Sequence, residues 1–204
     1  MTSVVESTHA RADVRTIVGG GVKLGALTAI GVVVFALASR PLTGSAELVV
    51  QSALVLVGGT LFAYLPAAWV RPNDVDSIGW AALLGLLGAL VFTVIDTVAL
   101  RPLGIYHWTW DAIGGGSGFW YVPVWWMAAT VLAWLGSWIA AIAIGTRGTF
   151  NIVVTAGPTI ALGLIVFAVL VFTNVAPLHT ATMALAFVSG LVLHVALAAA
   201  LRRR

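Results

Sequence analysis

The sequence predicts an all-α fold, an integral membrane bundle of six transmembrane helices, because its composition is apolar throughout and its apolar segments are as long as membrane spans. Of the 204 residues, 61% are hydrophobic and only 8% are charged. Soluble domains carry roughly 25% charged residues. The mean hydropathy of +1.07 indicates too little polar surface to coat a water-soluble globule, which excludes that class of protein.

Six continuous apolar windows are long enough to cross a bilayer, since about 30 Å of hydrocarbon requires roughly 20 helical residues. The windows run over residues 19–39, 47–70, 77–100, 119–144, 150–173 and 178–200. Proline, glycine or charged residues separate them, as expected where helices end. We expect a single membrane domain over residues 17–204, preceded by a flexible cytoplasmic N-terminus over residues 1–16.

The positions of Lys and Arg predict that both termini lie in the cytoplasm. Only Arg40 and Arg101 fall on one side of the predicted bundle, and the other side holds Arg11, Arg15, Lys23, Arg71, Arg147, Arg202, Arg203 and Arg204. Cytoplasmic loops carry an excess of basic residues. We therefore expect a multi-pass protein of the bacterial inner (plasma) membrane, N-in and C-in. Basic termini suit an anionic lipid surface, and no nucleic-acid partner is expected.

The first apolar window has a second interpretation, as the apolar region of a secretory signal peptide. Ala36-Leu37-Ala38 would then form the small-x-small cleavage site. The 21 residues before Val22 are long for the leading region of such a peptide, which favours a retained span. In a retained span, Gly21 and Gly25 would allow close approach of a neighbouring helix.

Asp96 is the first candidate site residue, because it is an acid inside the third apolar window. If Trp80 marks the inner interface, the helical rise places Asp96 roughly 5 Å inside the outer edge of the hydrocarbon. An acid at that depth costs a few kcal/mol unless it is paired or protonated. Two interpretations follow. Asp96 forms an ion pair with Arg101 that fixes the helix end, or it is a sheltered acid held for proton transfer or ligand binding.

The segment after Arg101 brings further polar and aromatic candidates to the same side. His107 and Asp111 are four residues apart and share a face if the segment is helical. Trp108 and Trp110 would share the other face of an extended segment. Anchoring at the membrane interface is the alternative role for these tryptophans.

A broad aromatic stripe is predicted further along the chain. Its members, Trp126, Trp134 and Trp138, would project within an arc of about 120° around one helix. Such a stripe suits packing, lipid contact or a flat apolar ligand.

No metal and no cofactor are expected. Potential ligands such as Asp96, His107, Asp111 and His179 lack a compact metal-binding spacing. His194 lies deeper in the sixth window and is expected to hydrogen bond between helices. The absence of cysteine excludes thiolate sites and disulfides. The single lysine, Lys23, is in the first window, which excludes a retinal protein with a Schiff base in its last span.

The order of residues over 96–126 resembles the carotenoid-biosynthesis hydratase family, whose members are polytopic membrane proteins. The resemblance is carried by Asp96, Pro102, Trp108-x-Trp110, Val122-Pro123 and a tryptophan at 125 or 126. One position departs from the pattern, since Arg101 precedes the proline where an acid would be expected.

The resemblance implies hydration of a terminal isoprenoid double bond without a cofactor. Asp96, with Asp111 as second choice, would protonate the double bond. Trp108 and Trp110 would stabilise the carbocation, and His107 would orient the attacking water.

The leading hypothesis is an outer-side aromatic and acidic pocket that handles an apolar or isoprenoid molecule. Its substrate-binding residues would be Tyr106, Trp108, Trp110, Trp120, Trp126 and Arg101. The alternative is a non-enzymatic accessory or binding subunit of a larger membrane complex. A small transporter is the third hypothesis. The expected partners are the lipid bilayer, the apolar ligand and, for the alternative, another membrane protein.

Overall fold

The computed structural model describes residues 13–105 and 121–202, with the backbone alone at Tyr121. The secondary structure of this part of the chain is entirely helical, as predicted. Its elements are α1 (Val14–Ser39), α2 (Gly44–Val70), α3 (Val75–Ile95), the π-helical turn η1 (Asp96–Leu100), α4 (Tyr121–Arg147), α5 (Ile152–Phe172) and α6 (Thr180–Leu201). Six helices are long and apolar enough to cross a membrane, with η1 continuing α3. The predicted fold class is confirmed.

The first helix begins earlier than expected. Residues 14–16 belong to α1, although the sequence analysis assigns them to the flexible N-terminus. The cause is a helix cap, because the Asp13 side chain accepts a hydrogen bond from the Arg15 backbone N–H at 3.1 Å. A capped first turn forms without the apolar contacts that define the membrane window.

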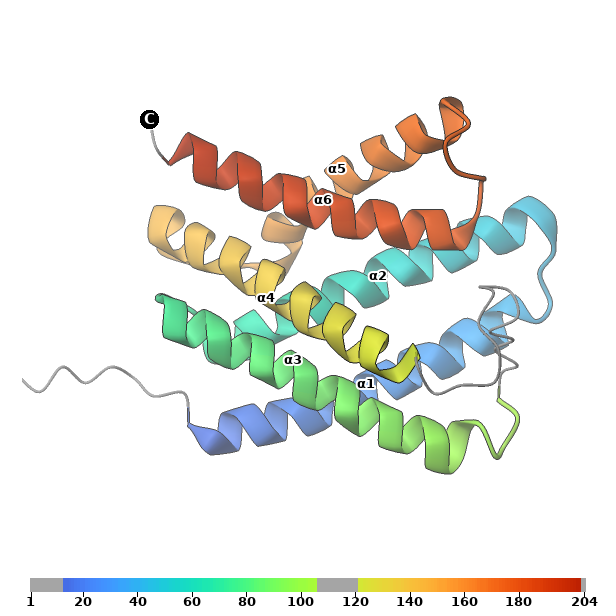
Figure 1. Cartoon of the computed structure of the whole chain (residues 1–204), viewed down its shortest axis with the longest axis horizontal. Coiled ribbons are helices and arrows are strands. Elements are labelled where there is room, and N and C mark those ends of the chain that lie inside the picture. Colours follow the sequence, from blue (N-terminus) through green and yellow to red (C-terminus); the bar gives the residue numbers. More distant parts are fainter. Residues whose placement is uncertain (1–12, 106–120, 203–204) are drawn as a thin grey trace, which may run out of the picture.

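Successive helices run in opposite directions, so the start of α1 and the end of α6 lie at the same end of the bundle (Figure 1, left). We call this the terminal end. Five of the seven described basic residues belong to it: Arg15, Lys23, Arg71, Arg147 and Arg202. Arg40 and Arg101 belong to the opposite end. The charge asymmetry predicted from the sequence is therefore present in the fold.

Small residues set the distance between helices. A Cβ added at Gly25 in α1 would lie 2.7 Å from the Gly88 carbonyl oxygen in α3, and one added at Gly21 would lie 2.7 Å from Leu87 Cβ. The expected close approach at these two glycines is confirmed. Gly190 in α6 meets the Thr159 carbonyl of α5 in the same way, at 2.6 Å. Because lipid tails are as apolar as the helices, tight packing of this kind replaces the hydrophobic effect as the force between spans.

The third span ends in a π-helical turn. The Arg101 backbone N–H donates to the Asp96 carbonyl at 3.0 Å, an i→i+5 bond. Such turns often occur at functional sites. A small apolar cluster of Ala29, Phe92 and Leu100 surrounds the turn. This cluster positions the residues considered next.

Candidate functional site

Asp96 and Arg101 form an ion pair at the end of the bundle opposite the termini. The Arg101 Nε–H donates to Asp96 Oδ2 at 2.8 Å, and the two side chains are 35% and 7% exposed respectively. The π-helical turn brings them together, because its i→i+5 hydrogen bonds place residues five apart about one turn from each other. The pair predicted from the sequence as one of two interpretations of Asp96 is therefore present.

The pair limits the chemistry of the carboxyl group. A guanidinium has donors only, so Asp96 Oδ2 is a hydrogen-bond acceptor in this arrangement. A proton delivered by Asp96 would have to leave from Oδ1. The charge-assisted bond also holds Arg101 beside Asp96, where a donor with a fixed orientation can bind the polar end of another molecule.

Trp125 packs against the apolar cluster at the end of α3 and has an indole N–H without an acceptor among the described residues. Its ring meets Phe62 and Phe92 edge to face, with centroids 6.2 and 5.9 Å apart. It also packs against the cluster that contains Leu100. The indole Nε1 is buried and has no hydrogen-bond partner. A buried donor without an acceptor costs about 1–3 kcal/mol, so an oxygen atom on a bound molecule would recover that energy.

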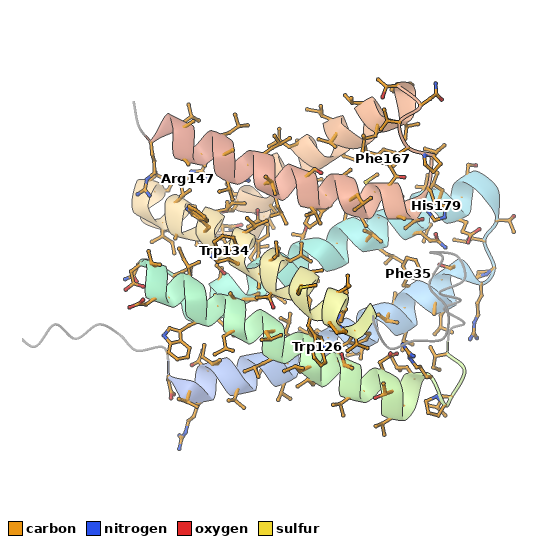
Figure 2. All side chains as sticks on the ribbon, viewed as in Figure 1. Phe35, Trp126, Trp134, Arg147, Phe167 and His179 are labelled. Carbon is orange, nitrogen blue, oxygen red and sulfur yellow. The ribbon has the colours of Figure 1, made fainter. Side chains whose placement is uncertain are left out.

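Trp126 of α4 lies against α3 (Figure 2) and is hydrogen bonded to it. Its Nε1–H donates to Thr93 Oγ1 at 3.0 Å, and the Thr93 hydroxyl donates to the Ala89 carbonyl at 2.8 Å. Thr93 lies one turn before Asp96. The sequence predicts one aromatic stripe of Trp126, Trp134 and Trp138. In the structure, Trp126 lies apart from the other two rings.

Trp134 and Trp138 form a separate pair further along α4. Their ring centroids are 5.5 Å apart, and both rings are more than a third exposed on the outside of the bundle. Exposed rings on a membrane span contact lipid or a partner. Trp126 instead packs in the interface between helices.

Six of the predicted site residues lie outside the described residues: Tyr106, His107, Trp108, Trp110, Asp111 and Trp120. Of the other three, Asp96 and Arg101 form the ion pair at the end of α3, and Trp126 bonds to Thr93 in the preceding turn. His179 caps α6 by accepting the Ala181 backbone N–H at 3.1 Å. Within the described part of the chain, no three His, Cys, Asp or Glu side chains are placed to hold a metal ion.

A second polar cluster joins α2, α5 and α6, and the sequence analysis singled out only one of its members. The Tyr64 hydroxyl and Thr159 Oγ1 are 2.6 Å apart, and Thr159 Oγ1 is 2.8 Å from His194 Nδ1. The expected hydrogen bond of His194 between helices is confirmed. Tyr64 and Thr159 were missed because each is a lone polar residue in an apolar window, without a local pattern.

The arrangement around Asp96 can bind the polar end of a mostly apolar molecule. It combines a paired carboxylate and guanidinium, an unused indole N–H and flat aromatic surfaces. No protein-family model, curated protein or solved structure matches this chain.

A double-mutant cycle tests the ion pair. Arg101→Gln should lower the free energy of unfolding by about 1–3 kcal/mol, because it leaves the buried Asp96 carboxylate without its charged partner. In the Asp96→Asn background, Arg101→Gln should lower the free energy of unfolding by a smaller amount. Unfolding in mixed detergent micelles, followed by tryptophan fluorescence, measures both. The exposed Arg147→Gln variant controls for loss of charge, and strictly additive losses would contradict the coupling.

Proposed function

We propose that this multi-pass membrane protein binds an apolar, isoprenoid-type molecule at the end of the bundle that contains Asp96. The polar terminus of the molecule would contact the Asp96–Arg101 pair, and its hydrocarbon would lie along Trp125 and Trp126. The observation that carries the proposal is the Asp96–Arg101 ion pair at the end of a membrane span, with the Asp96 carboxylate buried. Ionisable residues inside membrane spans are costly and by default mark functional sites.

Two features support a ligand over a purely structural pair. An ion pair with a buried carboxylate stabilises a fold weakly, because the desolvation of Asp96 offsets its attraction to Arg101. The Trp125 N–H, in a ring packed against the cluster that contains Leu100, has no acceptor among the described residues, and an oxygen-bearing ligand would supply one. A hydroxyl or carbonyl group at the end of an isoprenoid chain matches both requirements.

Copurification tests the binding proposal. The wild-type chain, purified in mild detergent and extracted with organic solvent, should carry one isoprenoid compound beyond bulk phospholipid, detected by mass spectrometry. The Asp96→Asn/Arg101→Gln variant should retain about tenfold less, the change expected for a loss of roughly 1.4 kcal/mol of binding free energy. Asp76→Asn, on the exposed first turn of α3, is the matched control. Equal retention by all three proteins, or no retained isoprenoid, would contradict the proposal.

Hydration of a terminal carbon–carbon double bond is the second candidate function. It is favoured by the burial of the Asp96 carboxyl group together with the resemblance to the carotenoid hydratases. In this reaction Asp96 would transfer a proton from Oδ1 to the terminal alkene. Water would then add to the tertiary carbocation and return a proton, which gives a tertiary alcohol without a cofactor.

Turnover of an acyclic carotenoid in ¹⁸O-labelled water tests this candidate. The wild type should place one labelled oxygen in the product, and Asp96→Asn should lose at least about a hundredfold in rate, as removal of a general acid does. Unchanged turnover by Asp96→Asn would rule out Asp96 as the acid. The Asp76→Asn variant should react like the wild type.

We also propose that the terminal end faces the cytoplasm across an inner (plasma) membrane, supported by the five-to-two distribution of described basic residues. The chain has no cysteine, so single cysteines report topology directly. Thr149 and Val175 flank α5 at its two ends and are both exposed. A membrane-impermeant maleimide should label Val175→Cys in intact cells and Thr149→Cys only after lysis. The reverse pattern would contradict the orientation.

A further inference from the structure

A basic groove lies at the terminal end, away from the Asp96 site. It has a volume of about 600 Å³ and runs between the first turns of α1 and the end of α2. Its walls include Arg15, Gly19 and Lys23 of α1 and Trp69 and Arg71 of α2. The α1 residues are four apart, so they lie on one face of the helix.

The groove is strongly positive. Arg15, Lys23 and Arg71 all line it, and none of its described lining residues is an acid. Within the described part of the chain, none of the three forms an ion pair. The nearby Asp13 side chain is used as a cap by the Arg15 backbone N–H. The arginines at the opposite end differ, since Arg101 is paired with Asp96 and Arg40 donates to the Ile105 carbonyl at 2.8 Å.

Two glycines keep the groove open. A Cβ added at Gly19 would have no atom of the described residues within 4 Å, so it would point into open space among them. A Cβ added at Gly20 would lie 3.2 Å from Trp69 Cε3, so this glycine allows the indole ring to pack on α1. Arg71 ends α2 in the left-handed conformation, with φ at 53° and its N–H bonded to the Ala67 carbonyl. The wall of the groove is thus formed by ordered backbone.

The groove lies at the ends of two helices that can span a membrane, where we expect the headgroup layer. Arg15 and Arg71 lie at the ends of helices that can span a membrane, where the hydrocarbon gives way to headgroups. Lys23 is eight residues further along α1, roughly 12 Å deeper, within reach of the headgroups for a long flexible side chain. Trp69 has the amphipathic ring that favours this layer.

From these observations we infer that the groove binds the phosphate headgroup of an anionic phospholipid from the surrounding leaflet. The guanidinium groups of Arg15 and Arg71 donate to the phosphate oxygens. The Lys23 ammonium, deeper along α1, adds a further positive charge. The open surface over Gly19 receives the glycerol backbone. Free phosphate shares the same oxygen chemistry, but the position of the groove at the ends of two helices that can span a membrane favours the lipid as the source of the occupant. The inference is independent of the Asp96 site.

Lipid binding to the full chain, measured by native mass spectrometry, tests the inference. Phosphatidylglycerol should bind more tightly than phosphatidylcholine. Arg15→Gln and Arg71→Gln should each weaken phosphatidylglycerol binding about fivefold. Gly19→Leu should weaken the preference without any change in charge, because its side chain covers the surface proposed to receive the glycerol backbone.

Two control variants separate the groove from general electrostatics. Arg147→Gln removes an exposed charge from the terminal end outside the groove, and Gly31→Leu adds the same side chain at another open glycine of α1. Both should keep the preference. The groove would be the wrong binding site if Arg147→Gln weakened phosphatidylglycerol binding as much as the groove variants. The same conclusion would follow if Gly19→Leu bound the lipid like the wild type.

Free phosphate and protein folding are checked in the same experiment. Inorganic phosphate at concentrations equal to the lipid should not displace phosphatidylglycerol, and displacement would overturn the lipid assignment. Should Gly19→Leu fail to fold, Arg15→Lys/Arg71→Lys replaces it. That double variant keeps the charge but loses the planar donors, and an undiminished preference in it would contradict the contacts assigned to the two guanidinium groups.

Discussion

Hydrocarbon offers no hydrogen-bond partner, and this constraint shapes the whole bundle. It requires helices, which satisfy their backbone internally, and it directs most polar side chains back to their own helix. Thr28, Thr130 and Ser189 each donate to the carbonyl four residues earlier, at 2.7–2.9 Å. The helices then associate through glycine contacts such as Gly25 against Gly88, because burial of apolar surface gains nothing over lipid.

A few polar side chains are not bonded to their own helix backbone, and they differ between the two ends of the molecule. At the end opposite the termini, Asp96 and Arg101 form an ion pair, and the N–H of Trp125 has no acceptor among the described residues. At the terminal end, three cations line an open groove without ion pairs among the described residues. The first arrangement suits the polar tip of an apolar molecule, and the second suits an anion. One bundle therefore presents two different chemistries to the two faces of the membrane.

The sequence predicts the spans well because hydropathy is a local property, and each apolar window corresponds to one helix. The Asp96–Arg101 pair was also predictable, since its members are only five residues apart. The hydrogen bond between Tyr64 and Thr159 joins residues 95 positions apart, and only the packing of α2 against α5 brings them together. The division of Trp126 from Trp134 and Trp138 likewise depends on which face of α4 meets α3.

The central claim is that a paired carboxylate is sheltered at the boundary of the membrane, at the end opposite the chain termini. A structure of the full chain in lipid nanodiscs, determined by electron cryomicroscopy, measures both parts of the claim. We expect Asp96 Oδ2 within hydrogen-bond distance of Arg101 Nε, inside the lipid belt and covered by protein. An Asp96 side chain separated from Arg101 and facing bulk water or acyl chains would contradict it.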